Sequence, residues 1–231
     1  MHDLALELAE LGHDITVLTA GENQRKDCIV EQVEGITVLR IRSGKREGVS
    51  LAIRAWNELL LSYHFWRRGK EEIIRRGCDL VVWYSPSIFF SGLIKKLKTH
   101  YRIPSYLILR DIFPQWAVDT GVMKKGPVFS FFRMKELQQY RQADIIAVQS
   151  PANLEYFNER GWNQKYKLEV LFNWTKPLEQ NVLSSDYRRK FGLENKVVFF
   201  MVAGLVLHRT LTILSDLPSE CKRIPMPIFY W

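Results

Sequence analysis

A basic and an acidic side chain stand together where the apolar run Leu107–Leu109 ends, in the stretch LILRDIFPQWAVDTGV. The carboxylate of Asp111 could hydrogen-bond to a hydroxyl group or accept its proton, while the Arg110 guanidinium holds a phosphate or fixes the carboxylate. The alternative is structural: Asp111 forms an Asx turn before Ile112 and Arg110 pairs with a neighbour. The choice depends on which edge of which sheet these residues occupy.

Two other apolar runs also end in polar residues followed by proline, at Tyr84-Ser85-Pro86 and Gln149-Ser150-Pro151. Tyr84, Ser85 and Ser150 could contact a substrate there. A serine before a proline is also a common helix start, so that each hydroxyl would only cap the next helix. For both serines capping is the stronger interpretation.

Short apolar runs alternate with helical segments along the chain. Strands are expected at 14–20, 36–42, 78–86, 104–110, 143–150 and 166–173, and helices at 4–11, 51–76, 87–100, 128–142 and 151–161. Several strands are continuous apolar runs, as in parallel sheets that are buried on both faces. The pattern predicts an α/β fold: a doubly wound, Rossmann-like parallel sheet with helices on both faces.

In this fold, polar residues at the ends of strands occupy the edge of the sheet where ligands bind. Open parallel sheets bind ligands beyond the carboxyl ends of their strands. Five residues are therefore predicted to line one rim of the sheet, namely Tyr84, Ser85, Arg110, Asp111 and Ser150.

Composition limits the partners. The formal charge of +8 favours an anionic partner such as a phosphorylated ligand or an anionic lipid surface. Basic clusters such as Arg67-Arg68 lie near aromatic residues such as Trp66, which suits a membrane surface. No strand offers the aromatic stacking platform that nucleic acid needs, so nucleic acid is not expected. Three scattered cysteines and isolated histidines predict neither a disulfide framework nor a metal site.

Five segments together are similar to a known family: LALELAELGHDITVLTAG, CDLVVWYSPSIFFSG, LRDIFPQWAVDTGVMKKG, ADIIAVQSPANLEYF and EVLFNW. In order and spacing they resemble the N-terminal domain of GT-B glycosyltransferases of family 4. The branch they most resemble is that of bacterial L-fucosamine-type transferases of O-antigen and capsule synthesis. The resemblance extends over residues 1 to about 200.

The resemblance implies two Rossmann-like domains facing each other across a cleft. The N-terminal domain receives a polyprenyl-diphosphate-linked acceptor, and the C-terminal domain holds a nucleotide-sugar donor. Transfer proceeds with retention and generally without metal, and no cofactor is implied. Asp111 and Arg110 would then be catalytic, with Tyr84, Ser85 and Ser150 binding substrate. The protein would be cytoplasmic and peripheral to the inner membrane.

The chain departs from the family pattern at both ends. We expect an acceptor-side domain at 1–172 whose sheet lacks its first, central strand, and a linker at 173–186. An aberrant start of the donor domain is expected at 187–231, opening with a helix and then a strand. The expectation is that this chain alone transfers no sugar.

Two other functions stay open. The first is a non-catalytic, membrane-associated remnant of such an enzyme. The second is a dinucleotide-binding oxidoreductase, which would need Gly-x-Gly-x-x-Gly between a first strand and a first helix, where this chain offers no such motif.

Overall fold

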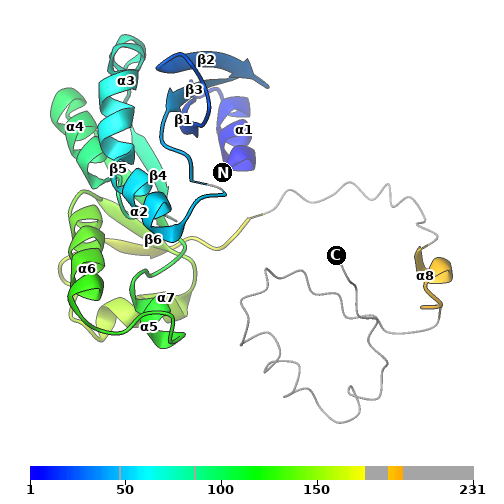
Figure 1. Cartoon of the computed structure of the whole chain (residues 1–231), viewed down its shortest axis with the longest axis vertical. Coiled ribbons are helices and arrows are strands. Elements are labelled where there is room, and N and C mark those ends of the chain that lie inside the picture. The colour runs from blue at the N-terminus through cyan, green and yellow to red at the C-terminus, as the bar shows by residue number, and fades with distance from the viewer. Residues whose placement is uncertain (47, 86, 175–186, 195–231) are drawn as a thin grey trace. The chain divides into compact units, whose positions relative to one another are not determined.

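The computed structural model describes residues 1–46, 48–85, 87–174 and 187–194, and the chain divides into two compact units, Met1–Lys176 and Pro177–Trp231 (Figure 1). Within the second unit the described part holds helix α8 (Tyr187–Lys190), in the segment predicted to be helical. The linker from residue 175 onward and the strand expected near 197–201 lie outside the described residues. The site and the sheets belong to the first unit.

The first unit contains two sheets. The smaller has the order β1-β3-β2 and consists of β1 (Thr16–Gly21), β2 (Cys28–Val33) and β3 (Ile36–Arg42). Strand β1 runs parallel to β3, whereas β2 runs antiparallel to it. The sequence did not predict β2, which joins β3 through a two-residue turn. Both turn residues, Glu34 and Gly35, have positive φ (49° and 82°), as a tight hairpin requires.

The larger sheet is parallel throughout, with the order β4-β5-β6-β7. Its strands are β4 (Val81–Ser85), β5 (Ser105–Leu109), β6 (Ile145–Val148) and β7 (Leu168–Val170). This confirms the predicted α/β fold with a parallel sheet. The expected sheet lacks a strand at its centre, and here β1 and β4 belong to separate sheets. The antiparallel strand β2 is a difference from the expected parallel pattern.

Seven helices are described in this unit: α1 (His2–Glu10), α2 (Leu51–Leu59), α3 (Leu61–Arg76), α4 (Ser91–Tyr101), α5 (Gln115–Asp119), α6 (Pro127–Tyr140) and α7 (Pro151–Asn158). The long helix predicted over 51–76 is broken at Leu60 into α2 and α3. Helices α6 and α7 each begin with proline, where the missing N–H costs nothing.

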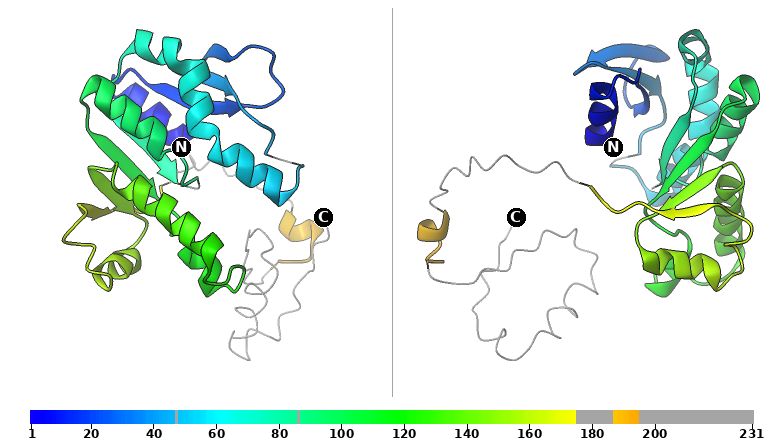
Figure 2. Two further views of the ribbon diagram at one scale, coloured as in Figure 1. Left: turned by 60° about the vertical axis from the view of Figure 1, so that its left-hand side comes forward. Right: turned by 180° about the vertical axis from the view of Figure 1, so that it is seen from behind.

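The hydrophobic core has two parts. On the larger sheet, alternate residues such as Leu107 and Leu109 pack against Ile94 of α4, Tyr140 of α6 and Phe157 of α7. The other cluster combines β3 with α3 and α4, through Leu39, Ile41, Leu61, Phe65, Ile73, Leu93 and Leu97. Helix α4 contributes to both clusters and therefore joins the two sheets. Figure 2 shows the ribbon from two further directions.

Candidate functional site

The strand register aligns the carboxyl ends of the larger sheet. Leu109 of β5 is paired with Ser85 of β4 on one side and with Val148 of β6 on the other. Neighbouring strands lie about 4.8 Å apart, so these ends form one edge. Arg110 and Asp111 follow directly after this row.

A cavity of about 320 Å³ opens beside Asp111. Three short segments line it: Arg110, Asp111 and Ile112 after β5, Gln115, Trp116 and Asp119 of α5, and Asn153 and Tyr156 of α7. Two of the predicted site residues, Arg110 and Asp111, therefore meet in its wall. The loop after β5 and the two helices supply the rest.

Arg110 is held by the chain that follows β7. Its Nη1 donates a hydrogen bond of 3.1 Å to the carbonyl oxygen of Leu171, and its guanidinium carbon lies 4.6 Å from the ring centroid of Trp174. The side chain is thus fixed by a carbonyl and an aromatic ring. The neighbouring carboxylate of Asp111 is on an exposed residue and is open to a ligand.

The other predicted residues, Tyr84, Ser85 and Ser150, do not line the cavity. Ser150 stands at the N-cap position of α7, but its hydroxyl donates to Oδ1 of Asn153 at 2.9 Å and caps no backbone N–H. Ser85 is buried, and its Oγ accepts a long hydrogen bond of 3.4 Å from Nε2 of Gln139. Tyr84, beside it, is exposed. Ser150 thus reaches the cavity through Asn153, and Ser85 faces the interior.

Helix α5 supplies residues that the sequence did not predict. Trp116 is 42% exposed beside the cavity. Nε2 of Gln115 donates to Oδ1 of Asp119 at 2.8 Å, one helical turn away. The i, i+4 spacing of these two polar residues is the signal that could have indicated the helix. Its five residues are too few to show a hydrophobic period.

A polar network in the interior holds two side chains of the cavity wall in place. Nη1 of Arg133 donates to Oε2 of Glu136 (2.5 Å) and to the hydroxyl of Tyr156 (2.6 Å), and its Nη2 donates to Oε1 of Gln115 (2.9 Å). Oε1 of Glu136 accepts from the Tyr140 hydroxyl at 2.7 Å. Arg133 therefore fixes two side chains of the cavity wall, Gln115 and Tyr156.

Glu136 is a carboxyl group inside the protein, only 1% exposed. Burial raises its pKa to about 7, although the charge of Arg133 and the hydrogen bond from Tyr140 oppose that rise. Arg133 and Tyr140 stabilise the charged carboxylate, but by less than the loss of hydration destabilises it.

Helix α6 buries some of its polar side chains and exposes some of its apolar ones, which is the reverse of the usual pattern. Glu136, Gln139 and Tyr140 are buried, whereas Phe131 and Met134 are exposed. Arg133, Glu136 and Tyr140 recur at helical spacing, which is the sequence signal for a buried polar stripe. Glu136 belongs to the network that reaches Gln115 and Tyr156 through Arg133, while Gln139 bonds to Ser85 and Tyr140 also packs in the core.

This arrangement suits a ligand with many hydroxyl groups. Carboxylate, amide and phenol groups from Asp111, Asn153 and Tyr156 offer hydrogen bonds, and the Trp116 indole offers a flat apolar face. A sugar ring presents both kinds of surface. Within the described ranges no group of three or more His, Cys, Asp or Glu side chains is arranged to hold a metal ion.

Comparison with known proteins identifies the family. The sequence profile described as "Glycosyl transferase 4-like domain" matches residues 1–174. The chain belongs to this family. The matched residues of this glycosyl transferase 4-like domain include both sheets and all the residues of the cavity. No sequence among curated proteins matches the chain.

Among solved structures, this glycosyl transferase 4-like domain is similar to sucrose-phosphate synthase (tll1590) from Thermosynechococcus elongatus. The TM-score is 0.60 at 16% sequence identity, over 82% of this chain and 45% of that chain. At this identity the likeness shows the fold alone. The chain spans less than half the length of that synthase.

Proposed function

We propose that this chain is the acceptor side of a retaining glycosyltransferase that moves a sugar from a nucleotide-sugar donor to a lipid-linked saccharide. One observation carries the proposal: Asp111 lies in a cavity lined by polar and aromatic side chains at the carboxyl edge of a parallel sheet, inside a glycosyl transferase 4-like domain. The resemblance of the sequence to L-fucosamine-type transferases favours a polyprenyl-diphosphate-linked acceptor in bacterial surface polysaccharide synthesis.

The contacts of Arg110 and Asp111 suit different parts of such an acceptor. The exposed Asp111 carboxylate accepts a hydrogen bond, and then the proton, from the attacking sugar hydroxyl. Arg110, held by Leu171 and Trp174, presents a fixed positive charge toward the acceptor diphosphate. Ser150 orients Asn153 in the wall. Tyr84 and Ser85 belong to the same rim one strand away.

Catalysis by Asp111 is tested in protein that carries both sides of the cleft, because the proposal assigns only the acceptor side to the matched residues 1–174. Transfer of labelled sugar from a panel of nucleotide sugars to a polyprenyl-diphosphate-linked saccharide is measured for the wild type and for Asp111→Asn. The amide cannot accept the proton, so turnover should fall roughly 10²-fold. Equal turnover would leave Asp111 a turn-forming residue.

We further propose that the chain meets this acceptor at an anionic membrane surface. Helix α2 exposes Ile53 and Trp56 to solvent, and the chain carries a net charge of +8. No helix in the described part of the chain is both long and apolar enough to cross a membrane. The proposed contact is made by these exposed side chains of α2 and by basic side chains at the surface.

Vesicle co-sedimentation tests this contact. The chain should bind vesicles that contain phosphatidylglycerol at low salt and dissociate as salt rises, since ions screen exposed charges. It should not co-sediment with vesicles of phosphatidylcholine alone. Binding that is indifferent to lipid charge would show that the basic side chains are only solvated surface.

A further inference from the structure

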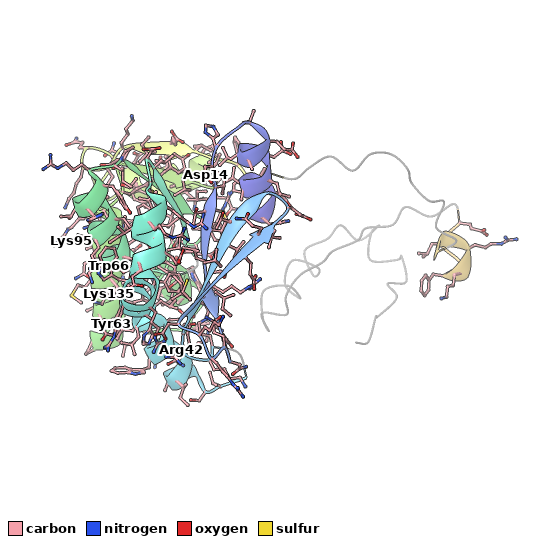
Figure 3. The ribbon with its side chains drawn as sticks, turned by 90° about the horizontal axis from the view of Figure 1, so that it is seen from above. Asp14, Arg42, Tyr63, Trp66, Lys95 and Lys135 are labelled. Carbon is pink, nitrogen blue, oxygen red and sulfur yellow. The ribbon has the colours of Figure 1, made fainter. Side chains whose placement is uncertain are left out.

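A second cavity, of about 310 Å³, lies where helices α2, α3, α4 and α6 converge. It shares no lining residue with the cavity at Asp111. Lys96 of α4 and Lys135 of α6 line it together with Tyr63 of α3, and none of its lining residues is acidic. In Figure 3 Tyr63 and Lys135 lie along the helical side of the unit, away from the strands of the smaller sheet.

The two lysines bring positive charge into the cavity without a counter-charge. The ion pairs of the described residues include neither Lys96 nor Lys135. Each ammonium instead lies near an aromatic ring: Nζ of Lys96 is 5.2 Å from the Trp66 centroid, and Nζ of Lys135 is 5.6 Å from that of Phe131. Within the described part of the chain, these two cations have aromatic rings as neighbours and no ion-pair partner, so they can still attract an anion.

The other walls are held in place by contacts between helices. The hydroxyl of Ser62 on α3 donates to the Phe89 carbonyl oxygen at 2.5 Å and accepts from the Leu93 N–H at 3.3 Å. These bonds fix α3 against the start of α4, whose first residues, Ser91 and Gly92, line the cavity. The N–H groups of a first helical turn add a weak preference for negative charge to that of the lysines.

Apolar side chains surround the charged part of the cavity. Leu59 and Phe89 lie in its lining. One helical turn before Leu59, Trp56 is 62% exposed, and one turn before Lys135, Phe131 is exposed. An anion bound between the lysines would therefore have exposed aromatic rings on two sides, from α2 and from α6.

We propose that this cavity binds the phosphate of an anionic phospholipid headgroup, with the exposed rings of Trp56 and Phe131 entering the membrane interface beside it. The inference rests on the proposed membrane contact and gives that contact a specific site. A phosphate dissolved in water would gain nothing from the surrounding rings, whereas a lipid phosphate lies at the depth where tryptophan and phenylalanine side chains are accommodated.

The test compares two double variants that each remove two positive charges. Lys96→Gln with Lys135→Gln removes the cavity lysines. Lys70→Gln with Lys95→Gln removes exposed lysines of α3 and α4 that do not line the cavity (Lys95 is labelled in Figure 3). Binding to vesicles of phosphatidylglycerol with phosphatidylcholine is measured for both variants and the wild type. Loss of two charges near such a surface weakens binding about 30-fold for either pair.

A headgroup site predicts that the cavity variant binds at least fivefold more weakly than the charge-matched control. Equal losses in the two variants, with wild-type binding intact, would overturn the headgroup site and leave the general membrane contact standing. No binding by the wild type would overturn both.

A second arm distinguishes the source of the phosphate. Inorganic phosphate is titrated into the chain while the amide resonances of Ser91 and Gly92 are followed by NMR. The headgroup site predicts only weak shifts that do not saturate at millimolar phosphate. Saturation there, lost in the Lys96→Gln, Lys135→Gln variant, would assign the cavity to a soluble phosphate and overturn the lipid.

Discussion

At the residue scale, Glu136 should make the stability of the fold depend on pH. Its pKa is about 7 in the folded protein, against 4.5 for an ordinary glutamate. Between these values the folded state holds a proton that the unfolded state has lost. Stability should therefore fall as pH rises from about 4.5 to 7, by about 3 kcal/mol from this group.

Urea unfolding of Glu136→Gln across this pH range tests that expectation. In this variant the free energy of unfolding should no longer fall with pH by the amount due to Glu136, because the glutamine amide does not titrate. Glu72→Gln is the matched control, since Glu72 also pairs with an arginine three residues away but keeps 30% of its side chain exposed, against 1% for Glu136. The account of the network is wrong if Glu136→Gln and Glu72→Gln show the same pH dependence.

Individual site residues differ in how far the sequence could reveal them. The position of Arg110 and Asp111 directly after a strand could be predicted, because an apolar run precedes them. Arg133 could not, because its partners Gln115 and Tyr156 lie 18 and 23 residues away along the chain. Ser85 illustrates a further limit: it does end a strand, but the side chain faces Gln139 in the interior.

At the element scale, the close approach of α3 to β3 depends on Gly69. A Cβ atom at this position would lie 2.6 Å from Cδ1 of Ile41, which is fully buried. Gly69→Ala should destabilise the protein by about 1–3 kcal/mol through overpacking, although alanine favours a helix by up to about 1 kcal/mol.

Gly92→Ala in α4 provides the comparison, because there the nearest atom would be at an ordinary 3.6 Å. Thermal unfolding should show a lower Tm for Gly69→Ala and an unchanged or higher Tm for Gly92→Ala. A Gly69→Ala protein as stable as the wild type would mean that α3 does not pack on Ile41 as described.

Strands and helices with a clear hydrophobic pattern could be predicted from the sequence. Elements that are defined by pairing or packing with other elements could not. The strands β4, β5 and β6 follow from apolar runs between helical segments. Strand β2 was missed because Cys28–Val33 mixes apolar and charged residues, and only its antiparallel pairing with β3 defines it. The break at Leu60 has no glycine or proline to mark it, so a single helix was the natural expectation.

At the scale of the whole unit, helices α3 and α4 pack between elements of the two sheets and so connect them. The two sheets share no ladder, but Leu93 and Leu97 of α4 pack toward β3 while Ile94 of the same helix packs on the larger sheet. The sequence could predict the α/β class because alternation along the chain determines it. It could not predict the strand order within each sheet, because pairing between distant strands has no local signal.

The central claim is that the cavity at Asp111 holds the acceptor sugar. The most direct measurement is isothermal titration of the chain with a short-chain, water-soluble polyprenyl-diphosphate monosaccharide. Three variants are compared with the wild type: Asp111→Asn, Trp116→Ala and Trp56→Ala. Trp56 is an exposed tryptophan that does not line this cavity and serves as the matched control.

The account predicts saturable binding by the wild type that is weakened about tenfold by Asp111→Asn, since a hydrogen bond to a charged group is lost. Trp116→Ala should weaken it to a similar extent, and Trp56→Ala should leave it unchanged. Binding that survives both cavity substitutions, or no binding by the wild type, would contradict the placement of the acceptor site.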